Sequence, residues 1–146
     1  MWTCPECGRT FANRRQTHTC APLRTLDEHF AGLDPAVRRT FDAVLEVVRS
    51  LGPVDVLPER TRIALHRRMS FAAFRPHRHW LDGHVVLARE LRSPRFRRVT
   101  TFSPRNVLHE FRLTSPEEVD AEVAGWLTEA YRVGEQRHLG RPPGMA

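Results

Sequence analysis

Residues 61–90 read TRIALHRRMSFAAFRPHRHWLDGHVVLARE, and this stretch decides the fold. Apolar and polar residues alternate along it with a period of two, which is typical of strands with one buried face. The pattern predicts a strand over 61–66, a turn at 67–68, a second strand over 70–75 and a third over about 80–89.

The third of these strands contains the pair Asp82-Gly83. We interpret it as one continuous strand with an irregularity at Gly83, although the same pair could also form a tight hairpin turn. A further strand is predicted over 106–113, where the residues that share an apolar face are Val107, His109, Phe111 and Leu113.

Helices are predicted on both sides of these strands, over about 25–32, 34–51 and 115–134. Apolar residues at helical spacing mark the second and third helices as core elements rather than cofactor sites. The predicted helix starts rest on a capping box at Thr25 and Glu28, on Asp34 before Pro35, and on a capping box at Ser115 and Glu118.

The N-terminal segment, residues 2–20, reads WTCPECGRTFANRRQTHTC. Cys4 and Cys7 have the spacing with which two thiolates grip one ion, and Gly8 suits the tight turn between such ligands. His18 and Cys20 complete a Cys3His set, which is typical of closed structural zinc sites. Four protein ligands leave no open position, so we expect a structural Zn2+ and not a catalytic one.

This segment resembles a C2H2 zinc finger in its opening, Cys-x2-Cys-Gly-Arg-x-Phe. It departs from that pattern at the second ligand pair, where one residue separates His18 from Cys20. Two residues at that spacing do not share a helix face, so the major-groove docking of such fingers is not carried over.

These signals divide the chain into a Cys3His zinc module over 1–22, a domain over 23–136 and a flexible tail over 137–146. The predicted fold class is α+β: an antiparallel sheet of four to five strands packed with N- and C-terminal helices and preceded by a small zinc-knuckle module. If both helices cover one face, the other face carries Arg62, His66 and neighbouring arginines into solvent.

The formal net charge is +6, and every Lys or Arg position is an Arg. The stretch 60–112 holds thirteen Arg against three acidic residues, whereas 115–135 holds one Arg against six. This polarity suits an anionic partner, of which nucleic acid is the commonest. The alternative is that acidic helices and basic strands offset each other within the fold.

The densest basic cluster is RELRSPRFRR at 89–98, a predicted loop broken by Pro94. Guanidinium groups suit phosphate oxygens, and an exposed Phe could stack on a base; the alternative is a solvated loop whose Phe packs into the core. The candidate nucleic-acid-binding residues are Arg92, Arg95, Phe96, Arg97 and Arg98 in this loop, and Arg9, Arg14 and Arg15 around the zinc segment.

His109 shares the apolar face of its strand. We interpret it as a hydrogen-bonded core histidine; the alternative is a ligand pocket formed by His109 and Arg62, in which the arginine holds an anion. No Cys follows Cys20, and no Ser or acid lies in a recognisable catalytic motif, which disfavours an enzyme.

Five stretches carry a family resemblance: TRIALHRRMSFAAFRP, HWLDGHVVLAREL, RFRR, NVLHEFRL and VDAEVAGWLTEAY. Their order resembles the bacterial domain of unknown function 5655 over roughly residues 25–135. Some members of that family carry a similar short Cys-rich N-terminus. The resemblance implies no established activity and no catalytic residue, but related domains resemble appendages of nuclease-like proteins, which adds to the nucleic-acid hypothesis.

The leading hypothesis is therefore a zinc-containing, non-enzymatic bacterial protein that binds nucleic acid through Arg-rich surfaces. The alternative is a module that binds a protein partner or a small anion through the sheet face or a pocket near His109. No apolar run approaches the roughly 20 residues needed to span a bilayer, and the N-terminus lacks the apolar core of a signal peptide. We accordingly expect a soluble, cytoplasmic protein with no membrane partner.

Overall fold

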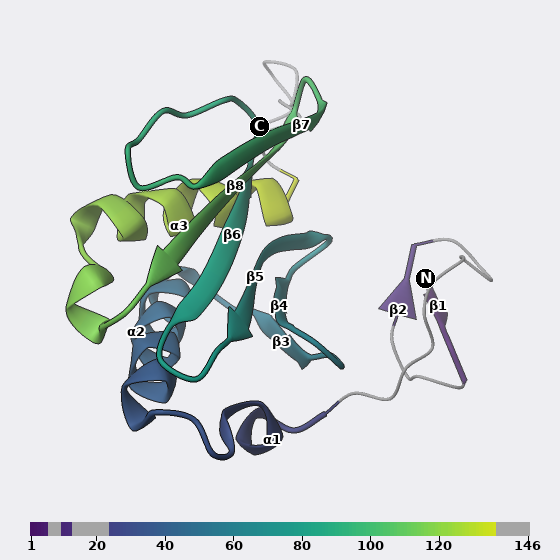
Figure 1. The fold of residues 1–146 in the computed structure, drawn as a ribbon. Helices are drawn as coiled ribbons and strands as arrows, with labels where there is room; N and C mark the ends of the chain where they lie inside the picture. Colours follow the sequence, from purple (N-terminus) through teal and green to yellow (C-terminus); the bar gives the residue numbers. More distant parts are fainter. Residues whose placement is uncertain (6–9, 13–23, 137–146) are drawn as a thin grey trace.

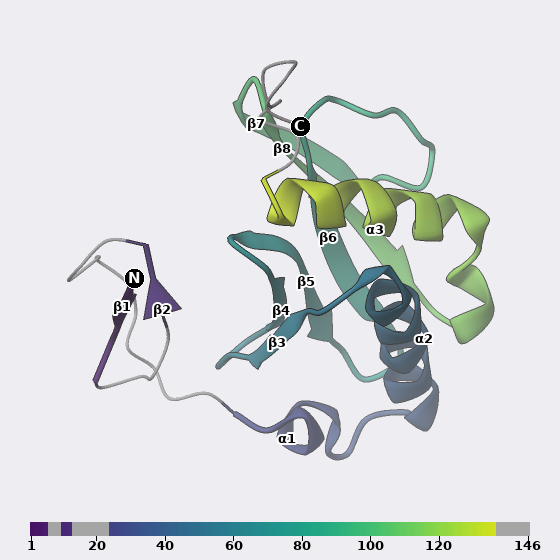
Figure 2. The same cartoon turned by 180° about the vertical axis from the view of Figure 1, so that it is seen from behind.

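The computed structural model describes residues 1–5, 10–12 and 24–136. It has the predicted α+β class, with α2 and α3 packed on one face of an antiparallel sheet (Figure 1 and, from behind, Figure 2). In chain order the elements are β1 (Trp2–Thr3), β2 (Thr10–Phe11), α1 (Leu26–Phe30), α2 (Pro35–Leu51), β3 (Asp55–Pro58), β4 (Ile63–His66), β5 (Ser70–Pro76), β6 (Leu81–Leu87), β7 (Arg98–Ser103), β8 (Asn106–Leu113), the 3-10 turn η1 (Pro116–Glu118) and α3 (Ala121–Gly134).

The main sheet has six strands in the order β3-β4-β5-β6-β8-β7, so the predicted count of four to five is too low. The four strands that we predicted are β4, β5, β6 and β8. The sequence pattern missed β3 and β7, which are the two edge strands. Neither contains a fully buried residue, and without a buried face a strand shows no clear apolar alternation.

The predicted irregularity at Gly83 is absent, because β6 pairs in regular register with both β5 and β8 there. A Cβ atom on Gly83 would lie 2.6 Å from Cε1 of Phe74 and 3.2 Å from Cε2 of Phe111. The glycine therefore gives two core rings access to the backbone, and the strand continues through it. The register shifts of the sheet lie instead between Leu65 and His66 and between Thr101 and Ser103.

The predicted starts of α1 and α2 are confirmed by their capping hydrogen bonds. The predicted start of the last helix is wrong: the side chain of Ser115 makes no capping hydrogen bond, and α3 begins later, after Asp120. The Asp120 carboxylate accepts a hydrogen bond from the Val123 amide. Glu118 accepts hydrogen bonds from Thr114 instead of completing a box with Ser115, which leaves only the short turn η1.

The core lies between the sheet and the helices, and a series of aromatic contacts runs through it. Phe41 on α2 meets Phe74 on β5, with ring centroids 5.9 Å apart, and Phe74 meets Phe111 on β8 at 6.2 Å. Phe111 in turn contacts Trp126 on α3 at 5.2 Å. These tilted and edge-on contacts tie both helices to the central strands β5 and β8.

One face of the sheet is thereby fully used for packing. On β8, Val107, Phe111 and Leu113 are buried as predicted, whereas Glu110 and Arg112 project to the opposite face. Within the part of the chain that the structure describes, no helix is long and apolar enough to span a bilayer.

We expect Gly83→Ala to lower the free energy of unfolding by about 2 kcal/mol, because overpacking a core costs more than the alanine gains in backbone entropy. Gly125→Ala is the matched control. Its added methyl group, in the middle of α3, meets no atom within 4 Å, so it should raise stability by up to about 1 kcal/mol. Urea unfolding measures both, and equal effects of the two substitutions would contradict the role assigned to Gly83.

Candidate anion-binding cleft

The face of the sheet opposite α2 and α3 carries a row of side chains that crosses four strands. Ala73 on β5 pairs with His84 on β6, His84 pairs with Glu110 on β8, and Glu110 pairs with Arg98 on β7. Because residues at directly paired positions share a sheet face, these four side chains lie side by side. Residues from distant parts of the sequence thus meet on one surface.

A second, parallel row crosses three of the same strands. Asp82 on β6 pairs with Arg75 on β5 and with Arg112 on β8. Nε of Arg112 donates a hydrogen bond of 2.8 Å to Oδ1 of Asp82, and its guanidinium carbon lies 4.4 Å from the ring centroid of Trp80. Burial is the largest single influence on Asp82 and opposes its ionisation, but the hydrogen bonds from Arg112 and Trp80 and the positive charge of Arg112 together outweigh it, so the pKa of Asp82 is lowered.

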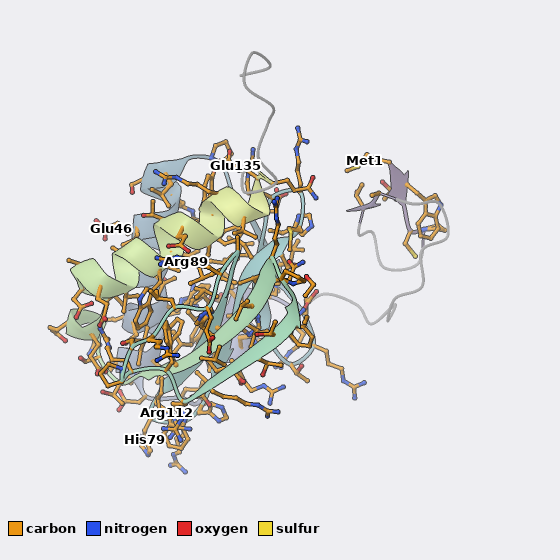
Figure 3. All side chains as sticks on the ribbon, turned by 90° about the horizontal axis from the view of Figure 1, so that it is seen from above. Met1, Glu46, His79, Arg89, Arg112 and Glu135 are labelled. Carbon is orange, nitrogen blue, oxygen red and sulfur yellow. The ribbon has the colours of Figure 1, made fainter. Side chains whose placement is uncertain are left out.

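Figure 3 shows the same arrangement from above: Arg112 and His79 project on the side of the sheet away from α3, whereas Arg89 lies beside that helix. Arg89 pairs there with Glu129 of α3, at 3.0 Å. The His77 ring stacks on Trp80 with centroids 5.1 Å apart, and its Nε2 lies 2.9 Å from Oδ2 of Asp82. Trp80 is therefore fixed between His77 and Arg112, and it is not a free stacking platform.

The two rows form the floor of an open cleft of about 460 Å3. The short residues Ala73 and Gly83 are among those that line it. The charged residues that line the cleft are Arg62, Arg75, Arg97, Arg98 and Arg112 against Asp82 and Glu110. With five guanidinium groups and two carboxylates, the cleft has an excess charge of +3 while His84 is neutral.

His84 lies in the floor of the cleft and is neutral at physiological pH. Its burial, and after that the positive charge of Arg62, lower the pKa of its imidazole to about 4. A neutral imidazole can donate one hydrogen bond and accept another without adding charge.

The five arginines differ in how firmly they are held. Arg112 is fixed by Asp82 and Trp80, and Nε of Arg62 donates a hydrogen bond of 2.9 Å to Glu59. Arg98 approaches Glu110 only to 3.9 Å, and its side chain is 75% exposed. Among the described residues no carboxylate forms an ion pair with Arg75 or Arg97. Three of the five guanidinium groups can therefore turn towards an anion at little cost.

The structure separates the residues of the predicted basic loop. Arg97 and Arg98 line the cleft. Arg95 points the other way, forms ion pairs with Asp120 and Glu122 at 3.0 and 3.2 Å, and donates a hydrogen bond to the Glu118 carbonyl oxygen. Arg95 therefore anchors the loop to the start of α3.

Two further members of the predicted set lie outside the cleft lining. Arg92 is exposed. The ring of Phe96 packs against Trp126 and His109, with centroid distances of 4.4 and 4.8 Å. Phe96 thus packs against the core, which was the alternative interpretation of this loop. It is not the exposed ring for base stacking that the nucleic-acid hypothesis required.

Arg62 and His109 are not brought together. Arg62 lines the cleft, whereas His109 is fully buried on the helix-covered face. Nε2 of His109 accepts a hydrogen bond of 2.9 Å from the Leu91 amide, and Nδ1 donates to the Val107 carbonyl oxygen at 3.0 Å. Burial lowers the pKa of His109, in keeping with a neutral core histidine.

The sequence pattern did not identify Arg75, Asp82, His84, Glu110 or Arg112 as members of one site. A signal was present for four of them, since Asp82, His84, Glu110 and Arg112 occupy the polar positions of strands with period-two alternation, whereas the run of buried residues in β5 gives no such signal for Arg75. Grouping them requires the register between β5, β6 and β8, which no local pattern supplies.

The predicted metal ligands are described only in part. Cys4 follows β1 and is buried. The described ranges contain no cluster of three or more His, Cys, Asp or Glu residues suited to a metal ion. The other predicted ligands, Cys7, His18 and Cys20, and the neighbouring Arg9, Arg14 and Arg15 lie outside the described residues.

The fold and the site define a small α+β domain that carries a cationic cleft on the uncovered face of an antiparallel sheet. Residues 26–134 match the family model described as "Domain of unknown function (DUF5655)", and the chain belongs to this family, as the resemblance predicted. No curated protein and no solved structure matches the chain.

The lowered pKa of His84 predicts a pH-dependent stability. Between about pH 6.5 and pH 4 the unfolded chain protonates this imidazole and the folded chain does not, so the free energy of unfolding falls as the pH falls. His84→Gln should remove up to about 3 kcal/mol of this loss. Urea unfolding at a series of pH values measures it, with His79→Gln, an exposed histidine, as the control. The same pH dependence in His84→Gln and the unaltered protein would contradict the assignment.

Proposed function

We propose that this protein binds nucleic acid through the phosphate backbone, in the arginine-lined cleft on the open face of the sheet. The observation that carries the proposal is the convergence of five guanidinium groups on one cleft with only two carboxylates. The guanidinium group is planar and presents a fork of donors that matches phosphate oxygens.

The two rows of side chains suit a strand of phosphates. Residues on one face of a strand repeat about every 7 Å, so Arg98 and Arg112 stand one such step apart on neighbouring strands. Phosphate contacts fix the position of a nucleic acid but carry no sequence information. Binding is accordingly electrostatic in the main and weakly sequence-selective.

Arg97→Gln combined with Arg98→Gln should weaken the binding of labelled oligonucleotides about ten-fold or more, because it removes two phosphate contacts. The measurement is fluorescence anisotropy over a salt series from roughly 50 to 200 mM, in which the slope of log affinity against log salt should fall by about two. The matched control is Arg39→Gln combined with Arg49→Gln, which removes the same charge from exposed positions on α2.

If the two double variants lose the same affinity for the oligonucleotides, the net charge of the protein and not the cleft governs binding. No binding at the lowest salt would reject the proposal. Competition by inorganic phosphate for a small labelled phosphate ester would then support the small-anion alternative, which uses the same guanidinium groups.

We further propose that the N-terminal segment binds one structural Zn2+ through Cys4, Cys7, His18 and Cys20. Trp2 pairs with Phe11 and Thr3 with Thr10 in two antiparallel strands, and Cys4 directly follows the first of them. Cys4, at the end of β1, is only 3% exposed. Three thiolates and one imidazole are a donor set that zinc prefers.

The purified protein should contain one zinc ion per chain by elemental analysis, and Cys7→Ser should lose it, because a closed structural site needs all four ligands. His79→Gln removes an exposed histidine of the domain instead and should retain the metal. Full zinc content in Cys7→Ser, or none in the unaltered protein, would contradict the ligand set.

A further inference from the structure

Among the residues whose side chains the structure describes, Phe102 on β7 is the aromatic one that the fold leaves most exposed. It is 71% exposed, and the other exposed large hydrophobic residues in the described ranges are Met1 and Val99. Phe96, which precedes Phe102 by six residues, is by contrast packed on Trp126. An exposed aromatic ring on the strand that also carries Arg98 of the cationic cleft suits a ligand that has both a flat apolar surface and negative charge.

Phe102 lies on the same edge strand as Arg98 of the cleft. Arg98 and Thr100 occupy alternate positions of β7, paired with Glu110 and Leu108 on the open face, and Phe102 follows Thr101, after which this regular alternation ends. It lies about 13 Å along the strand from Arg98.

The register of β7 shifts between Thr101 and Ser103, so Phe102 is the extra residue of a bulge-type irregularity. Such irregularities at sheet edges re-aim a side chain out of the regular pleat. The irregularity also frees the ring from a cross-strand neighbour, which agrees with its high exposure.

From this arrangement we infer that the cleft takes single-stranded rather than duplex nucleic acid, with one base stacked on Phe102 and the adjoining phosphates held by Arg97 and Arg98. This inference rests on the proposed function. A base can stack on a protein ring only when it has left its own stack, which single strands permit and paired duplexes resist.

The size of the cleft favours the same ligand. At about 460 Å3 it falls within the range of small-ligand pockets, roughly 300–1,000 Å3. Such a space accommodates one or two nucleotides of an extended strand, whereas a duplex brings two backbones joined by stacked pairs. The duplex therefore meets only the rim of the cleft and loses the contacts at its floor.

The test compares three labelled probes by fluorescence anisotropy: an oligothymidylate of about 12 nucleotides, an abasic strand with the same number of phosphates, and a duplex of the same length. The unaltered protein should bind the oligothymidylate about ten-fold or more tightly than the other two. Phe102→Ala should lower the affinity for the oligothymidylate roughly ten-fold, in keeping with one lost stacking contact, and should leave the affinity for the abasic strand unchanged.

Three further variants separate stacking from other roles of this side chain. Phe102→Trp should keep the affinity, whereas Phe102→Leu, which retains apolar area but no ring, should behave like Phe102→Ala. Val99→Ala shortens an exposed apolar side chain on the same strand, at a position paired with His109 of the opposite face. This control should leave the affinity for all three probes unchanged. Urea unfolding confirms that the variants retain the fold.

Equal affinity of the unaltered protein for single strand and duplex would overturn the inference, as would an unchanged oligothymidylate affinity in Phe102→Ala. In either case a loss of binding in the Arg97 and Arg98 variant would still uphold the proposed function. If no probe binds at the lowest salt, the proposed function fails and this inference fails with it.

Discussion

The packing of aromatic rings against the backbone of Gly83 is the contact on which the architecture depends. Phe74 and Phe111, on the two strands that flank β6, both approach this residue so closely that a Cβ atom would overlap them. They link Phe41 of α2 to Trp126 of α3, so both helices are held on one face of the sheet. Once that face has taken up the apolar side chains, the opposite face is left for polar and charged ones, and the cationic cleft lies there.

A single partly buried ring divides the basic loop between the two faces. Phe96 is fixed against Trp126, and the residues on either side of it diverge. Arg95 turns to the carboxylates at the start of α3, while the amide of Arg97 donates a hydrogen bond to the Glu110 carbonyl oxygen. The hypothesis that acidic helices offset basic segments thus holds for Arg95, and for Arg89 with Glu129. It does not extend to Arg97, which has no ion-pair partner among the described carboxylates.

Much of the fold could be predicted from local sequence patterns, because burial on one face produces a period of two in β6 and β8. β4 and β5 are instead recognisable as short, mostly buried apolar runs on either side of a turn. The edge strands β3 and β7 lack that pattern. A glycine within a strand looks the same in the sequence whether it bends the strand or, like Gly83, lets aromatic rings pack against its backbone. For the site, Arg97 and Arg98 were found because they are adjacent in a dense basic cluster. His84 and Arg112 were missed because their proximity depends on strand register, and register follows from the whole sheet rather than from any short segment.

The two carboxylates in the cleft are best understood through the cost of assembling five guanidinium groups. Like charges held close together repel, and the repulsion would destabilise the fold. Asp82 stands between Arg75 and Arg112, and Glu110 stands beside Arg98, so each acid reduces that repulsion.

Asp82 and Trp80 also hold Arg112 in one orientation, so an arriving anion meets a donor whose side-chain entropy is already lost. Because the acids number two and the arginines five, the repulsion is moderated while the cleft stays positive. A neutral His84 in the floor adds hydrogen-bonding capacity without further charge, since its burial keeps the proton off at physiological pH. The same balance is what the proposed binding of phosphate requires, since it limits repulsion within the fold and leaves the cleft positively charged.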